Sequence, residues 1–154
     1  MRILTLCVGN ICRSPLAQAL LARELQHPQH GLPGAQVASA GLGALVGHPA
    51  DPLALQVAQA HGLDVSGHRA QQISALLCQQ HQLILVMEQA HKTALEQQFP
   101  QVRGKVFRLG HASAPSGGFD IADPYRQPLP AFEAAYAAIA QGVAHWVPRI
   151  RQLA

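Results

Sequence analysis

A thiol and a guanidinium lie close together near the start of the chain, in the segment Cys7-Val8-Gly9-Asn10-Ile11-Cys12-Arg13-Ser14-Pro15. The apolar run before this segment predicts a strand and the apolar pattern after it predicts a helix, so the segment is expected to be a tight loop. Ser14 is a good helix N-cap, and Pro15 would then occupy the first helical position. Because a helix N-terminus carries unpaired amides and a partial positive charge, this loop is a candidate anion site.

The backbone and side chains of this loop are suited to hold a phosphoryl group. If the loop curls inward, a set of backbone amides would face the anion, namely those of Val8, Gly9, Asn10, Ile11, Cys12 and Arg13. Gly9 and Asn10 are expected to allow this curl, because both residue types tolerate a positive φ. The planar guanidinium of Arg13 would fold back over the loop and bind two oxygens of the phosphoryl group.

Cys7 would lie at the centre of this anion site and is the candidate nucleophile. A free thiol has a pKa of about 8.5, but helix N-termini and neighbouring arginines lower such values to roughly 3.5–7.5. We therefore expect Cys7 to be a thiolate that attacks phosphorus and forms a phosphocysteine intermediate. The Ser14 hydroxyl is close enough to hydrogen-bond this sulfur and assist its later departure.

A second candidate group, Asp123, lies late in the chain in the irregular stretch 110–127, beyond the last predicted strand. A thiolate that attacks a phosphate ester expels an alkoxide or phenoxide, which is slow unless a general acid protonates the leaving oxygen. Asp123 suits this role, and Pro124 would stiffen the backbone that holds it. The same carboxylate would then activate the water that hydrolyses the phosphocysteine, and Tyr125 would form an aromatic wall beside a phenyl ring.

The remaining polar residues near the loop are expected to support it. Asn10, Ser39 and His68 are predicted to hold the curl of the loop by hydrogen bonds. Two interpretations of Cys12 stay open: a small residue packed under the loop, or a redox partner that traps oxidised Cys7 as a disulfide. Cys78 is expected to be a core thiol.

The elements around these residues alternate between strand and helix. Strands are predicted at residues 2–6, 36–40, 83–87 and 105–109, and helices at 16–25, 51–60, 70–80, 88–98 and 130–153. This order indicates an α/β fold, a single-domain open four-stranded parallel sheet with helices on both faces. The connection 41–50 is expected on the same rim as the Cys7 loop. Ile73, Leu76 and Leu77 would share the buried face of the third helix, and Pro148 would kink the last helix or start a separate turn.

The composition of the chain limits the classes of function it can have. The chain of 154 residues is 49% hydrophobic, which allows one well-buried core, so residues 1–154 are expected to form one domain. Only 12% of residues are charged and the net charge is +3, which argues against a nucleic-acid or membrane partner. No signal or membrane-spanning segment is expected, and the three unclustered cysteines suit the reducing cytoplasm. The nine histidines show no metal-ligand spacing, so neither a metal nor another cofactor is expected.

The sequence resembles the low-molecular-weight protein tyrosine phosphatases over essentially its whole length. The shared motifs are the Cys7 to Pro15 loop, Ser39-Ala40-Gly41, Gly67-His68-Arg69-Ala70, Leu85-Val86-Met87-Glu88 and Asp123-Pro124-Tyr125. The stretch from Gly41 to Pro52 is most similar to the bacterial branch that dephosphorylates the tyrosine autokinases of capsule and exopolysaccharide export. The chain departs from many relatives at the rim, where it has Leu45 in place of an aromatic residue and a single tyrosine after Asp123-Pro124.

The resemblance implies a phosphotyrosine phosphatase I-like fold and hydrolysis of phosphotyrosine and small aryl phosphates, with inorganic phosphate as product. It implies Cys7 as nucleophile, Arg13 as phosphate clamp and Asp123 as acid and then base, with supporting roles for Asn10, Ser14, Ser39 and His68. It also implies a bacterial tyrosine autokinase as the protein substrate. The expected substrate contacts are Val8, Gly9, Asn10, Ile11, Cys12, Ser14, Leu45 and Tyr125.

Two alternatives use the same loop differently. An arsenate reductase on this fold would need further cysteines just after the third strand, where this chain reads Met87-Glu88-Gln89-Ala90-His91. A non-catalytic phosphate-binding regulator would not need Cys7, Arg13 and Asp123 together. The sequence therefore favours the phosphatase over both.

Overall fold

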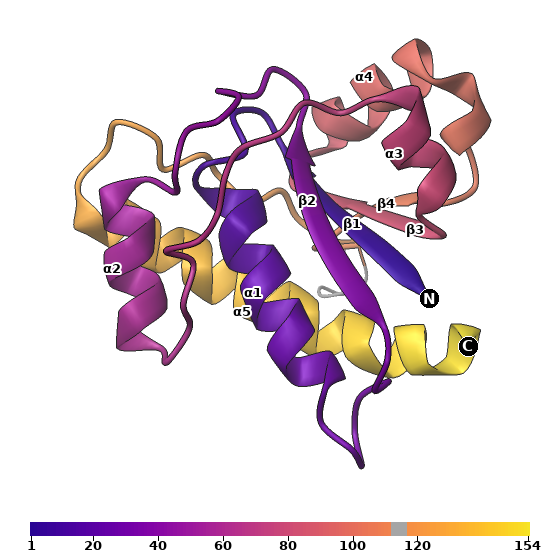
Figure 1. The fold of residues 1–154 in the computed structure, drawn as a ribbon, viewed down its shortest axis with the longest axis horizontal. Coiled ribbons are helices and arrows are strands. Elements are labelled where there is room, and N and C mark those ends of the chain that lie inside the picture. Colours follow the sequence, from indigo (N-terminus) through magenta and orange to yellow (C-terminus); the bar gives the residue numbers. More distant parts are fainter. Residues whose placement is uncertain (112–116) are drawn as a thin grey trace.

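The computed structural model describes residues 1–111 and 117–154, and its centre is a four-stranded parallel sheet (Figure 1). The strands are β1 (Arg2–Cys7), β2 (Gln36–Gly41), β3 (Leu83–Val86) and β4 (Val106–Arg108), in the order β2-β1-β3-β4. Because all pairings are parallel, the carboxyl ends of the strands lie at one edge, where Cys7 is paired with Gly41. The predicted sheet is confirmed.

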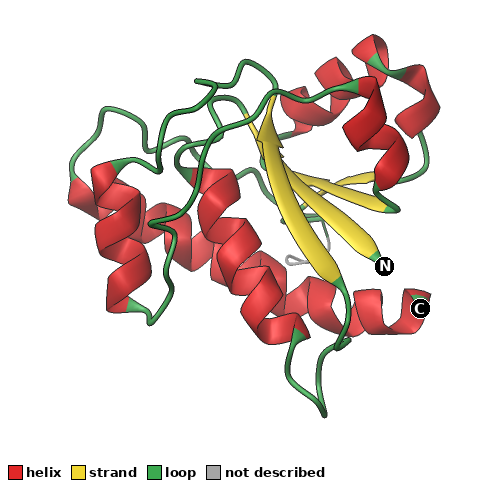
Figure 2. Cartoon of the chain, viewed as in Figure 1, coloured by secondary structure: helices red, strands yellow, loops and turns green. Residues whose placement is uncertain are grey.

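Helices cover both faces of this sheet, as Figure 2 shows. One face carries α1 (Arg13–Leu25), α2 (Pro52–Ala60) and α5 (Leu129–Leu153); the other carries α3 (Ala75–Gln80), α4 (Gln89–Gln98) and the short 3-10 turn η1 (Pro100–Val102). Side chains of a strand alternate between faces, so Ile3 packs with the α1 side while Leu4 packs with the α4 side. The sheet is thus buried on both faces, in agreement with its continuous apolar strands.

The third predicted helix is shorter than the sequence suggested. Residues 70–74 are not helical, and Gln72 forms an isolated parallel bridge with Gly41 instead. The helix begins only at Ala75, where the Ser74 hydroxyl accepts a hydrogen bond from the Leu77 amide. Ile73 is buried but Leu76 is 60% exposed, so the predicted common face is wrong. Hydrogen bonds to the end of β2 compete successfully with local helix formation for this backbone.

The last helix, α5, runs without interruption through Pro148 to Leu153, so the prediction of a separate last turn is wrong. Its apolar stripe explains the continuity, because Ile150 beyond the proline is buried on the same core as Val143 and Val147. In the part of the chain that the structure describes, no helix combines the length and apolarity that a bilayer crossing requires.

Two buried histidines make the stability of this fold depend on pH. Burial lowers the pKa of His81 and of His91 below the ordinary value of 6.5. Below about pH 6.5 these histidines therefore bind protons more readily in the unfolded chain than in the folded chain. The free energy of unfolding should decrease as the pH falls through that range. Urea unfolding at pH 7.5 and 5.5 measures this decrease.

A variant at His81 provides the control for this prediction. The His81 Nδ1 atom lies 2.6 Å from the Leu77 carbonyl oxygen, a hydrogen bond that an asparagine amide can replace. His81→Asn should therefore fold and show a smaller loss of stability between the two pH values. A wild-type protein equally stable at both would contradict the prediction.

Candidate active site

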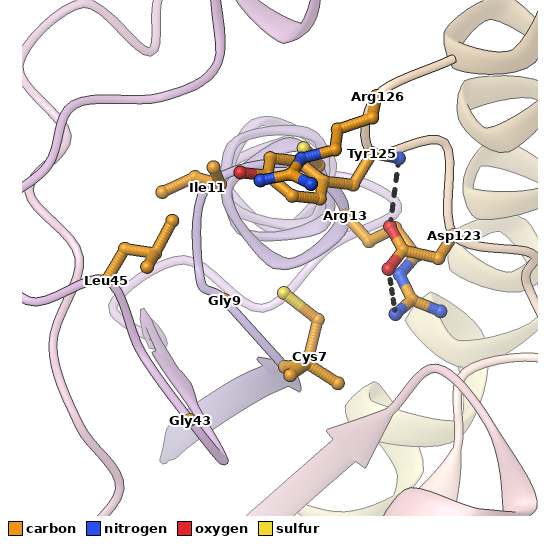
Figure 3. Close-up of a pocket in the computed structure, with 11 residues that line it drawn as sticks. Cys7, Gly9, Ile11, Arg13, Gly43, Leu45, Asp123, Tyr125 and Arg126 are labelled. Carbon is orange, nitrogen blue, oxygen red and sulfur yellow. Dashed lines mark hydrogen bonds and ion pairs between the residues drawn. The ribbon is translucent and has the colours of Figure 1, made fainter.

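A pocket of about 310 Å³ lies at the carboxyl edge of the sheet, where β1 passes into α1 (Figure 3). Three connections enclose it: the loop between β1 and α1, the connection after β2, and the segment that precedes α5. The residues that line it are Cys7, Val8, Gly9, Ile11, Cys12, Arg13, Gly43, Leu45, Asp123, Tyr125 and Arg126. The structure thus brings Cys7, Arg13 and Asp123 together, although Asp123 is far from the other two in sequence.

The loop from Val8 to Cys12 leaves its backbone amides free. Within the described ranges, no acceptor takes a hydrogen bond from the amides of Val8 through Arg13. The loop carbonyls, in contrast, accept hydrogen bonds from the connection after β2: Leu42 N to Cys7 O is 2.9 Å, and Gly43 N to Val8 O is 3.0 Å. Carbonyls held by a neighbouring loop and amides left unpaired form a cradle suited to an anion.

Glycine at position 41 permits this close approach of the two loops. A Cβ atom there would lie 2.3 Å from the Val8 carbonyl oxygen, a distance that no real side chain tolerates. Gly41 is therefore required by packing at the end of β2, not by an unusual φ.

Ser14 does not cap α1, contrary to the sequence prediction. The helix begins at Arg13 and Pro15 is its third residue, with no side-chain hydrogen bond at the cap position. The Ser14 hydroxyl instead lies 2.9 Å from the Cys7 sulfur and accepts a hydrogen bond from the Asn10 amide at 2.7 Å. A hydroxyl committed to the nucleophile cannot also serve a first-turn amide, which leaves those amides for a ligand.

Asn10 holds the curl of the loop from beneath, outside the pocket lining. It has a left-handed φ of 59°, whereas Gly9 does not have the positive φ expected for it. The Asn10 amide nitrogen donates to Ser14 and, at 2.9 Å, to the Ser39 hydroxyl. Its amide oxygen accepts from the Gln71 backbone at 2.9 Å, and its carbonyl oxygen lies 2.6 Å from His68 Nε2. These hydrogen bonds fix Asn10 in the left-handed conformation, and the loop closes without a positive φ at Gly9.

Replacement of Asn10 by alanine should destabilise the protein by about 2–3 kcal/mol. Alanine is strained at a left-handed φ, and the substitution leaves buried hydrogen-bonding groups of Ser14, Ser39 and Gln71 without their partner. Urea unfolding measures the change, with the exposed Gln59→Ala on α2 as a surface control expected within about 0.5 kcal/mol of wild type. Equal stability of the two variants would show that Asn10 does not hold the loop.

Arg13 is buried, with 1% of its surface exposed, and its charge is met by fixed partners. Its Nη1 atom hydrogen-bonds the Glu88 carboxylate and donates to the Ile121 carbonyl at 2.7 Å. Its Nη2 atom lies 3.6 Å from the Asp123 carboxylate. No described residue accepts a hydrogen bond from the Nε and Nη2 edge, so this edge is free to bind two oxygens of an anion.

Glu88 is a functional candidate that the sequence analysis did not single out. It lies just beyond β3, separated from the strand by Met87, at the edge where parallel sheets bind ligands. This position in the chain was the signal that could have identified it. His91 lies behind it, with Nε2 3.3 Å from the Glu88 carboxylate. Burial, and then the positive charge of Arg13, lower the pKa of His91. The ring of His91 thus favours its neutral form beside the carboxylate that hydrogen-bonds Arg13.

Asp123 stands at the pocket with its side chain 46% exposed. One carboxylate oxygen accepts a hydrogen bond from the Tyr125 amide at 3.1 Å, and the other faces Arg13 (Figure 3). A carboxylate fixed at one oxygen and open to solvent at the side chain can exchange a proton with a bound ester or with water.

Cys12, like Cys7, is a free and buried thiol that lines the pocket. Burial raises the pKa of the Cys12 thiol far above its ordinary value, and the nearby negative charge of Asp51 raises it further. Cys12 packs in the main core and stays protonated, so it is not a competing nucleophile. Cys78 is fully buried in the core on the other face of the sheet.

Two further pocket residues, Gly43 and Arg126, and the supporting Gln71 also escaped the sequence analysis. Arg126 directly follows the Asp123-Pro124-Tyr125 motif and Gly43 lies in the connection expected at this rim, so sequence position was the available signal for both; Gln71 had no such signal. Among residues 1–111 and 117–154, no cluster of three His, Cys, Asp or Glu side chains is arranged to hold a metal ion.

Comparison with known proteins places these features in a family. The family model described as low molecular weight phosphotyrosine protein phosphatase matches residues 2–153. The probable low molecular weight protein-tyrosine-phosphatase EpsP of Ralstonia nicotianae is 52% identical over 98% of this chain and 97% of its own length. The low molecular weight protein-tyrosine-phosphatase Wzb of Salmonella typhimurium is 48% identical over 94% of this chain and 91% of its own.

A solved structure also matches this chain over nearly its whole length. Wzb of Vibrio vulnificus, in complex with benzylphosphonate, superposes with a TM-score of 0.87 at 42% identity. The match covers 96% of this chain and 97% of that one. Sequence and architecture therefore lead to the same group of proteins.

Proposed function

The chain belongs to the low molecular weight phosphotyrosine protein phosphatase family and is a protein-tyrosine-phosphatase, and on that premise we propose how its own residues carry the reaction. The observation that carries the proposal is the cradle of unpaired amides from Val8 to Arg13 around the Cys7 sulfur. These amides, with the free edge of Arg13, bind the three terminal oxygens of a phosphate monoester. The phosphorus then lies beside the thiolate of Cys7.

In the first step the Cys7 sulfur attacks phosphorus, and the bond from phosphorus to the tyrosine oxygen breaks. Asp123, in its acid form, gives its proton to the leaving phenolic oxygen, so tyrosine departs neutral and phosphate remains on Cys7. The amides and Arg13 stabilise the charge that spreads over the equatorial oxygens in the transition state.

In the second step the Asp123 carboxylate takes a proton from a water molecule, whose oxygen attacks the phosphocysteine. The bond from phosphorus to sulfur breaks, inorganic phosphate leaves, and the sulfur departs as a thiolate. The Ser14 hydroxyl, 2.9 Å from that sulfur, donates a hydrogen bond to the departing charge. Asp123 ends each cycle in the acid form, ready for the next ester.

The pocket mouth supports an aromatic ester as the substrate. Ile11, Leu45 and Tyr125 present apolar surface around the entrance, where a phenyl ring would lie (Figure 3). The Vibrio vulnificus relative was solved with benzylphosphonate, which joins a phenyl group to a phosphonate. We assign phosphotyrosine in a protein, and small aryl phosphates, to this pocket.

A tyrosine autokinase of bacterial exopolysaccharide export is the proposed protein substrate, and the cytoplasm the proposed site of action. The support is the likeness to EpsP and Wzb together with the Gly41 to Pro52 connection. Incubation with the autophosphorylated kinase of the same organism should remove its phosphotyrosine, and an unaffected kinase would exclude this partner.

Rapid quenching of the reaction with p-nitrophenyl phosphate tests the mechanism. Mass spectrometry of the quenched protein should locate phosphate on the peptide that contains Cys7. Phosphate on another residue, or turnover without any phosphoenzyme, would contradict the proposed nucleophile.

A further inference from the structure

Arg126, at the mouth of the pocket, has a backbone conformation that arginine rarely adopts. Its φ is 64°, and in the described part of the chain Asn10 is the one other non-glycine residue with a positive φ. Asparagine tolerates this region, whereas a long side chain is strained there. Strain retained beside an active site indicates a function for the side chain.

A tight turn imposes this conformation. The Gln127 amide donates to the Pro124 carbonyl at 2.9 Å, which makes Arg126 the third residue of a β-turn. A turn with positive φ at that position favours glycine. The same segment fixes Asp123, because the Tyr125 amide donates to its carboxylate and the Gln127 side chain to its carbonyl. Glycine would therefore build this turn more easily, so the arginine side chain has another use.

The guanidinium of Arg126 lies over the ring of Tyr125, 5.2 Å from its centroid, and both residues line the pocket (Figure 3). The carboxylates of Glu88 and Asp123, on either side of Arg13, are both paired with that arginine. No ion pair in residues 1–111 and 117–154 involves Arg126. The positive charge of Arg126 therefore has no carboxylate partner at the pocket entrance, and a cation–π contact with Tyr125 holds the guanidinium there.

We propose that Arg126 forms a second anion subsite, which selects phosphotyrosine segments that carry another negative group beside the phosphotyrosine. The proposal rests on the phosphatase function above. With the phosphoryl group in the cradle, the phenyl ring passes Tyr125, and the neighbouring peptide residues emerge where the Arg126 guanidinium lies. A carboxylate or a second phosphate there would accept two hydrogen bonds from the planar guanidinium.

Three phosphotyrosine peptides, identical except at the positions flanking the phosphotyrosine, test the subsite. The flanking residues are glutamine, glutamate, or a non-hydrolysable phosphotyrosine analogue, so that the carboxylate and phosphate sources are separated. The wild type should favour an acidic peptide over the glutamine peptide by roughly threefold to tenfold in kcat/KM, mainly through KM. This preference should weaken at high ionic strength, because the guanidinium is exposed to solvent.

Variants at Arg126 assign the preference to this side chain. Arg126→Gln should reduce the acidic-to-neutral ratio to about one, and Arg126→Lys should keep part of it because the charge remains. Arg126→Gly removes the charge in a residue that adopts positive φ without strain, so it should fold and show the same loss of preference. The matched control is Arg149→Gln, which removes an arginine from the ring of Trp146, 6.0 Å away and outside the pocket.

The outcomes separate the subsite from the phosphatase function. Loss of the acidic preference in Arg126→Gln and Arg126→Gly, with the preference retained in Arg149→Gln, supports the subsite. Equal hydrolysis of all three peptides by the wild type, or an undiminished preference in the Arg126 variants, overturns the subsite and leaves the phosphatase function standing. A wild type that hydrolyses none of the peptides overturns the phosphatase function itself.

Discussion

Replacement of Cys7 by serine is expected to lower kcat for p-nitrophenyl phosphate by about 10⁵-fold or more, since loss of a covalent nucleophile has effects of this order. A serine hydroxyl is a weak nucleophile unless a neighbouring base activates it, and the neighbour here, the Ser14 hydroxyl, is not a base. The amide cradle and the Arg13 edge do not depend on the sulfur. Inorganic phosphate should therefore still bind, which steady-state kinetics of the wild type and calorimetry of the variant measure together.

Cys78→Ala is the control for this variant. It removes another buried thiol, but one in α3 on the opposite face of the sheet. Its activity per folded molecule should stay close to that of the wild type. Turnover by Cys7→Ser at the wild-type rate would end the phosphocysteine mechanism.

Replacement of Asp123 by asparagine is expected to lower kcat by about 10²–10⁴-fold, the usual contribution of a general acid–base group, with a small change in KM. Asparagine keeps an oxygen that can accept the 3.1 Å hydrogen bond from Tyr125, so the turn should survive. The loss should be larger for phenyl phosphate than for p-nitrophenyl phosphate. Phenoxide is the more basic leaving group and depends more on protonation.

This leaving-group dependence distinguishes acid catalysis from positioning, because Asp123 also faces Arg13 at 3.6 Å. An equal loss for both esters would indicate that Asp123 acts by orienting Arg13. Asp120→Asn is the matched control: its carboxylate lies on the same segment but is paired with Arg108, and it does not line the pocket. That variant should retain most of the wild-type activity.

Much of the fold was predictable because its signals are local. Leu83 to Val86 forms a buried strand within the predicted range 83–87, and α2 spans Pro52–Ala60, where the sequence predicts a helix at 51–60. The failures occur where distant backbone competes with local preference. Gln72 pairs with Gly41 across the sheet edge, and this contact cannot be read from the apolar spacing of residues 70–80.

The order of residues alone determined that the thiol and the guanidinium lie at the start of one helix. Cys7 and Arg13 are separated by a single loop between a buried strand and a helix, so chain connectivity by itself brings the thiol to the helix N-terminus. Hydrophobic burial of β1 and α1 then leaves the loop little freedom. A short loop between two buried elements can be predicted from sequence, because few backbone conformations can connect them.

The tertiary structure decided what surrounds that cradle. Glu88 and Asp123 reach Arg13 only because β3 lies beside β1 and because the segment before α5 returns to the same edge. Both of those carboxylates pair with Arg13, and Arg126 lies over the Tyr125 ring without an ion pair to any described residue. Such contacts depend on how separate elements pack, and the residue types at each position, taken one at a time, do not specify that packing.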